Sequence, residues 1–121
     1  MTGLLLSDDL IFTSRVTGTA RDLGGAVTAA RTADALLALA RQSPPACVIL
    51  DLANPWLRLG ELLAALAGLP QRPLVVAYGS HVDTAGLRAA QEAGCDVVLP
   101  RSRFVDELPA ALPGWLAGGR P

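Results

Sequence analysis

Short apolar segments alternate with helix-like segments along this chain, and that alternation constrains the fold more than any other feature. The predicted strands are mostly apolar at every position, not only at alternate ones: Gly3–Ser7, Ala26–Ala30, Ala46–Leu50, Leu74–Tyr78 and Asp96–Leu99. Continuous apolar strands are typical of parallel sheets that are covered on both faces. The sequence therefore predicts an α/β fold built from successive strand–helix units.

The segments between the strands carry apolar residues at helical spacing. The predicted helices are Leu10–Leu23, Thr32–Gln42, Leu57–Leu69 and Val82–Ala93. The tail from Ser102 to Leu116 has the same periodicity, but Pro109 and Pro113 interrupt it. Because an interior proline removes a backbone donor and clashes with the preceding turn, we expect a broken or short last helix.

Five such units with right-handed crossovers leave few topologies. We predict a flavodoxin-like, doubly wound, five-stranded parallel sheet with strand order 2-1-3-4-5 and helices on both faces. At 121 residues we expect a single domain over residues 1–121, with an ordered core of about residues 3–116. Cys47 and Cys95 fall at strand starts too far apart to pair, and we expect buried free thiols.

Charge and hydropathy exclude several classes of protein. The formal net charge of −1 gives no electrostatic reason to expect a nucleic-acid partner or an anionic membrane. No apolar run approaches the ~18 residues that a membrane span needs. We therefore expect a cytoplasmic protein.

Acidic residues stand where two of the predicted strands end. Asp8 and Asp9 follow the first strand, and Asp51 follows the third. In the predicted order these strands are neighbours, so the three carboxylates should meet at the carboxyl edge of the sheet, where such folds bind ligands. Three carboxylates repel one another unless a hard cation such as Mg²⁺ lies between them. Alternatively, Asp8 and Asp9 only begin a helix and Asp51 is a turn residue.

The paired acids, together with Asp51 and Pro55 of the DLANP segment, make the sequence resemble the receiver domain of bacterial two-component response regulators. The resemblance covers nearly the whole chain. It implies that Asp8, Asp9, Asp51 and the backbone carbonyl of Ala53 bind Mg²⁺. It also implies that Asp51 accepts a phosphoryl group from a histidine kinase.

Other positions depart from the family pattern. Where receivers place Thr or Ser at the end of the fourth strand, this chain has Tyr78, and Ser80 lies two residues later. Arg101 stands at the position of the family's lysine, and Val98 at that of an aromatic residue. The residues that bind metal and accept phosphate are thus kept, whereas those that relay the signal are altered.

Two further groups could bind an anion or a partner near the same edge. His81 is the only histidine, and Arg103 lies two residues after Arg101. The simpler interpretation is that both are solvated surface charges.

The favoured function is a stand-alone receiver-like signalling module, phosphorylated at Asp51, that acts by protein–protein contacts with a histidine kinase or another signalling protein. The alternative is a degenerate receiver that serves as a phosphorylation-independent interaction or dimerisation module. A homodimer is plausible because the helices are rich in alanine. We do not expect an enzyme, because Mg²⁺-dependent phosphatases of this type need a second acid where the chain has Ala53.

Overall fold

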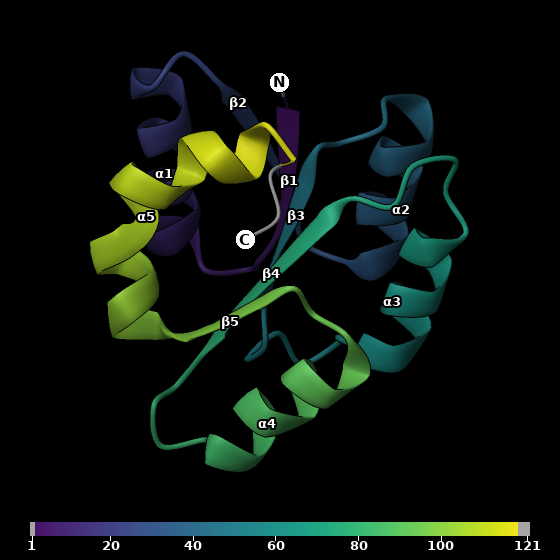
Figure 1. Cartoon of the computed structure of the whole chain (residues 1–121), viewed down its shortest axis with the longest axis vertical. Helices are drawn as coiled ribbons and strands as arrows, with labels where there is room; N and C mark the ends of the chain where they lie inside the picture. The colour runs from purple at the N-terminus through teal and green to yellow at the C-terminus, as the bar shows by residue number, and fades with distance from the viewer. Residues whose placement is uncertain (1, 119–121) are drawn as a thin grey trace.

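The computed structural model describes residues 2–118, so residues 1 and 119–121 of the predicted domain lie outside it. Strands and helices alternate along the chain (Figure 1): β1 (Thr2–Leu6), α1 (Leu10–Asp22), β2 (Ala26–Ala30), α2 (Ala33–Gln42), β3 (Cys47–Asp51), α3 (Leu59–Ala67), β4 (Leu74–Gly79), α4 (Thr84–Ala93), β5 (Val97–Pro100) and α5 (Arg101–Leu116). The predicted alternation is confirmed, with boundaries that differ by at most two residues. No helix in this described range is long and apolar enough to cross a membrane.

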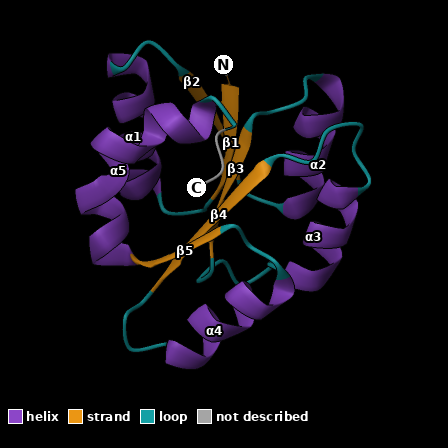
Figure 2. Cartoon of the chain, in the orientation of Figure 1, coloured by secondary structure: helices purple, strands orange, loops and turns teal. Residues whose placement is uncertain are grey.

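All strands form one parallel sheet in the order β2-β1-β3-β4-β5, as predicted. Helices α1 and α5 cover one face of the sheet, and α2, α3 and α4 cover the other (Figure 2). The architecture is the flavodoxin-like arrangement expected from the sequence. It brings the ends of β1 and β3 side by side at the carboxyl edge.

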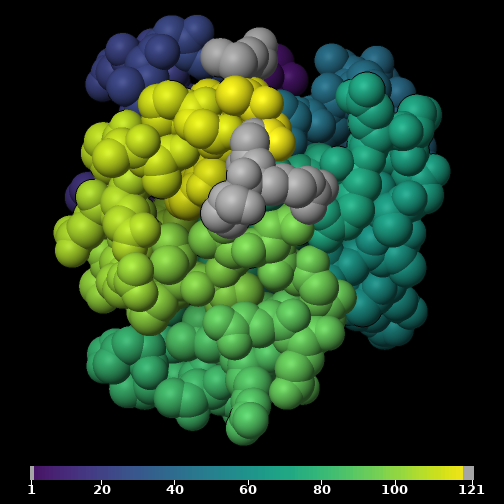
Figure 3. Space-filling view, viewed as in Figure 1, coloured from purple at the N-terminus to yellow at the C-terminus, as the bar shows by residue number. Residues whose placement is uncertain are grey.

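Each face of the sheet has its own apolar core because side chains alternate along a strand. Leu5, Ile49 and Tyr78 pack toward α1 and α5, whereas Leu6 and Leu50 pack toward the other helices. Side chains fill the spaces that separate the ribbons of α3, α4 and α5 in Figure 1 (Figure 3). Cys47 and Cys95 are buried free thiols, as predicted.

The last helix corrects the sequence-based expectation, because α5 is continuous from Arg101 to Leu116. Pro109 and Pro113 lie four residues apart and both are exposed, so they share the solvent-facing side. The carbonyls that lose a donor there can be hydrated. The opposite side buries five residues against the sheet, which holds the helix together: Phe104, Leu108, Leu112, Trp115 and Leu116. Figure 1 shows α5 bending along its length, the usual response to proline.

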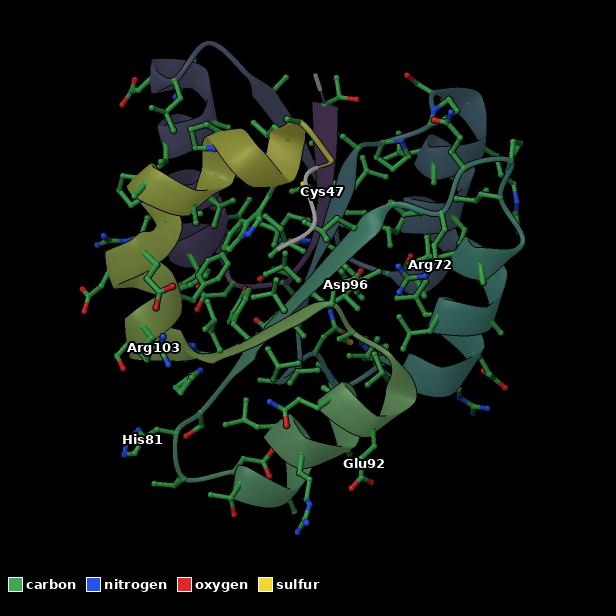
Figure 4. The ribbon with its side chains drawn as sticks, in the orientation of Figure 1. Cys47, Arg72, His81, Glu92, Asp96 and Arg103 are labelled. Carbon is green, nitrogen blue, oxygen red and sulfur yellow. The ribbon has the colours of Figure 1, made fainter. Side chains whose placement is uncertain are left out.

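An ion pair ties the start of β5 to β4. Arg72 donates to Asp96 at 2.9 Å and to the carbonyl of Gly94, and Asp96 also accepts from the amide of Val75 at 2.8 Å. The two side chains point toward one another in Figure 4. This pair lies away from the carboxyl edge, and its role is to join the starts of β4 and β5.

Candidate functional site

Asp51 is the last residue of β3 and is only 3% exposed. Its Oδ1 accepts a hydrogen bond from the amide of Ala53 at 2.9 Å, and its Oδ2 accepts one from the hydroxyl of Ser7 at 3.3 Å. The guanidinium of Arg101 lies 3.8 Å from Oδ1. A buried carboxylate is tolerated when it is paired and hydrogen-bonded, and Asp51 has both kinds of partner.

Ser7 is a site residue that the sequence reasoning missed. Leu6 pairs with Leu50 in the parallel register, so the next residues, Ser7 and Asp51, lie against one another. Ser7 is 2% exposed, and its hydroxyl also accepts from the amide of Asp9 at 3.1 Å. The strand register would have identified it, because the residue directly before the acid pair, and not the pair itself, faces Asp51.

The acids of the β1–α1 loop do not converge with Asp51 as predicted. Asp9 is the N-cap of α1, and its carboxylate accepts from the amide of Phe12 at 3.0 Å. Asp8 is exposed and lines a surface hollow with Arg31, Thr32 and Trp56. Between residues 2 and 118 no three His, Cys, Asp or Glu side chains are grouped so as to hold a metal ion. The residues present therefore do not fit the expected Mg²⁺ site.

Tyr78 is the penultimate residue of β4 and lies beside Asp51, with which it is paired in register. Its ring is fully buried and stacks between Phe12 and Phe104, with ring centroids 4.6 Å apart in each case. The Arg101 guanidinium lies 5.7 Å from the Phe12 centroid and 6.0 Å from that of Tyr78, within range of a cation–π interaction. Burial raises the pKa of Tyr78 well above its usual value, and the charge of Asp51 raises it further, so the phenol stays protonated.

Two polar atoms at this site are buried without a hydrogen-bond partner in the part of the chain that the structure describes. They are the hydroxyl oxygen of Tyr78, which lies close to Ser7 and Asp51 without forming a well-aligned hydrogen bond to either, and the Nε of Arg101. Such groups destabilise a fold by about 1–3 kcal/mol each. Unsatisfied buried groups are uncommon in native proteins and call for a functional or structural explanation.

Three other predicted site residues lie outside this cluster. Ser80 is exposed, and its hydroxyl accepts from the amide of Val82 at 3.3 Å. His81 is exposed and points away from the sheet in Figure 4. Arg103 forms an ion pair with Glu107 at 2.9 Å, one turn along α5. Of the basic residues considered at this edge, only Arg101 reaches Asp51.

The loop after β3 is held by Asn54, a second residue that sequence reasoning passed over. Asn54 is 4% exposed, donates to the carbonyl of Arg31 at 3.2 Å and accepts from the amide of Trp56 at 2.9 Å. These bonds join the β3–α3 loop to the β2–α2 loop. Ala53, the expected carbonyl ligand, is thereby fixed next to Asp51.

Comparison of the sequence with protein-family models and with curated proteins gives no match. Comparison of the structure does. A protein described as a response regulator from Chloroflexus aurantiacus J-10-fl superposes with a TM-score of 0.82 at 21% identity, covering 96% of this chain and 97% of that one. The chain has the receiver-domain fold.

Two further structures are similar to the chain. The receiver domain of the Francisella response regulator 1452 gives a TM-score of 0.79 at 19% identity, with 96% of each chain covered. NtrX from Brucella abortus, in complex with ADP, gives 0.80 at 24% identity over 96% of this chain. This chain spans only 27% of NtrX.

Proposed function

We propose that this chain is a receiver-type signalling module that accepts a phosphoryl group on Asp51 and acts through protein–protein contacts. The observation that carries the proposal is the placement of Asp51. It is a buried carboxylate at the carboxyl end of a central strand, with the Arg101 guanidinium 3.8 Å away. Ligands of open α/β sheets bind at this edge.

The reaction needs a phosphodonor with a labile P–N bond, such as a phosphohistidine or phosphoramidate. A carboxylate oxygen of Asp51 attacks phosphorus and forms an O–P bond. The P–N bond breaks, and the nitrogen keeps the electron pair and takes a proton. The Arg101 guanidinium reduces the repulsion between the carboxylate and the incoming anion, and it can bind phosphoryl oxygens.

Exposed apolar side chains around Asp51 support a protein partner. The large apolar residues that are most exposed in the described range follow the carboxyl ends of strands: Leu10, Ile11, Trp56 and Val82, at 66–84% exposure. Apolar residues gathered at one edge are typical of a protein contact surface. A partner that delivers or reads the phosphoryl group would cover this rim.

Phosphoramidate treatment followed by intact-mass measurement tests the proposal. We expect the wild-type chain to gain one phosphoryl group and Asp51→Asn to gain none. Asp8→Asn is the matched control, because Asp8 is exposed and lies outside the cluster, and it should still be labelled. Equal labelling of Asp51→Asn and the wild type would contradict the proposal.

The alternative, a phosphorylation-independent interaction module, is favoured by one observation. The stack of Phe12, Tyr78 and Phe104 fills the space beside Asp51 and fixes Tyr78, which stands where receivers place a relay Thr or Ser. Native mass spectrometry separates the two functions. An assembly that forms equally with and without phosphoramidate supports the alternative, and one that changes with Asp51 phosphorylation supports the main proposal.

A further inference from the structure

The charge of Asp51 is balanced by groups of the chain itself. Ser7 and the Ala53 amide each donate a hydrogen bond to the carboxylate, and the Arg101 guanidinium lies 3.8 Å away. Arginine remains charged at any pH that proteins meet. The side chain that faces Asp51 from the end of β1 is the neutral Ser7, not the carboxylate of Asp8 or Asp9.

Two buried donors beside Asp51, the hydroxyl of Tyr78 and the Nε of Arg101, make no hydrogen bond within residues 2–118, although the hydroxyl lies close to Ser7 and Asp51. Packing explains the ring of Tyr78, which stacks between two phenylalanines, but it does not explain the hydroxyl, because Phe would fill the same space. The hydroxyl stays protonated, since burial and the charge of Asp51 both raise its pKa. The Nε of Arg101, whose guanidinium lies near the Phe12 and Tyr78 rings, is the other donor without a hydrogen-bond acceptor among residues 2–118. A phosphoryl group brings three strong acceptor oxygens.

We infer that Arg101 is the cation of this site in place of a divalent metal ion, and that its Nε and the Tyr78 hydroxyl bind oxygens of a phosphoryl group on Asp51. This inference rests on the proposed function. It assigns the charge compensation to the chain's own guanidinium and predicts phosphorylation that does not depend on Mg²⁺. Asp9 is thereby left to cap α1, where the structure places it.

The dependence on metal is the first test. The full chain is treated with phosphoramidate in EDTA or in millimolar Mg²⁺, and the phosphorylated fraction is followed by intact mass. We expect initial rates within about threefold of one another, because no metal-bound group takes part. Labelling that appears only with Mg²⁺ overturns the inference and leaves the proposed function standing. No labelling under either condition rejects the proposed function and the inference with it.

The hydroxyl is tested by Tyr78→Phe, which keeps the ring stack and removes one atom. We expect the aspartyl phosphate of this variant to decay about tenfold faster than that of the wild type, the effect of losing one hydrogen bond to a charged group. The Tm of the unphosphorylated variant should be unchanged or higher, because an unpartnered donor has been removed. Equal phosphate lifetimes in the two proteins would overturn the role of Tyr78.

The role of the uncharged Ser7 opposite Asp51 is tested without phosphorylation. Ser7→Asp places a second carboxylate against Asp51, and the two should repel until a divalent cation binds between them. We expect millimolar Mg²⁺ to raise the Tm of Ser7→Asp, and to leave the wild type and the control Ser7→Asn unchanged. A rise in the wild-type Tm with Mg²⁺ that disappears in Asp51→Asn would show a metal site and overturn the inference.

Discussion

At the scale of single residues, the buried thiols and the buried phenol determine how stability responds to high pH. Burial raises the pKa of Cys47 from 9.0 to about 12 and that of Cys95 from 9.0 to about 11. Tyr78 is the only tyrosine, its pKa is raised further still by burial and by Asp51, and the chain has no lysine. Few other side chains therefore titrate in the same range.

Proton linkage determines whether stability rises or falls with pH. Each folded-state pKa lies above its unfolded value, so the associated stability is complete below about pH 8.5 and is lost as the pH rises toward the folded values. We expect the free energy of unfolding in urea to fall steadily from about pH 9 to pH 11. The slope should be smaller in Cys47→Ala, whatever its absolute stability. A flat profile over this interval would contradict the assigned burial.

Not every residue of the site could be predicted from the sequence. The spacing of apolar runs and acids located Asp51 at a strand end, and the resemblance to receiver domains placed Arg101 near it; both lie at the site. The sequence pattern could not place Ser7, because a shift of one residue in a parallel register exchanges the side chain that faces the crevice. β1 ends at Leu6, which puts Ser7 opposite Asp51 and leaves Asp8 exposed. Pattern alone does not fix a register to one residue.

At the scale of elements, α5 shows how tertiary packing overrides local propensity. Pro109 predicts a break, yet the helix continues because the prolines face solvent while the opposite side is buried. The missing backbone hydrogen bond at Pro109 should still lower the free energy of unfolding of the folded protein. We expect Pro109→Ala to restore a backbone hydrogen bond and to raise the free energy of unfolding by about 1–3 kcal/mol, measured by urea denaturation.

A neighbouring exposed position provides the control for that measurement. Ala110→Gly changes only helix propensity and should lower the free energy of unfolding by about 1 kcal/mol. If Pro109→Ala proves less stable than the wild type, the bend in α5 is itself required for packing against the sheet, and the proline is favourable where it stands.

At the scale of the whole molecule, the strand order followed from the sequence because topology rules leave little choice once five strand–helix units are recognised. The two cores could not be assigned so directly. Which face of the sheet each helix covers depends on side chains that alternate between them, and it is the folded structure that separates α1 and α5 from the other helices. Both cores share one sheet, so neither can unfold alone without exposing the other.

That sharing predicts cooperative unfolding. Phe104 lies in the core under α1 and α5, and Leu62 lies in the core on the opposite face. Cavity-forming substitutions should cost about 3–5 kcal/mol for Phe104→Ala and about 2–5 kcal/mol for Leu62→Ala. The fluorescence of Trp115, whose ring centroid is 5.8 Å from that of Phe104, reports on one face, and far-ultraviolet circular dichroism reports on the whole chain.

The measurement uses a Trp56→Phe background, so that the buried Trp115 is the only indole, because Trp56 is 73% exposed and would obscure the core signal. We expect fluorescence and circular dichroism to give the same midpoint in both cavity variants, including Leu62→Ala, whose cavity lies on the face remote from the reporter. Coincident transitions are the test of all-or-none unfolding. If Leu62→Ala moved the dichroism midpoint and left the Trp115 transition in place, the two faces would be separate units. A change at Asp51 could then stay local instead of reaching the whole sheet.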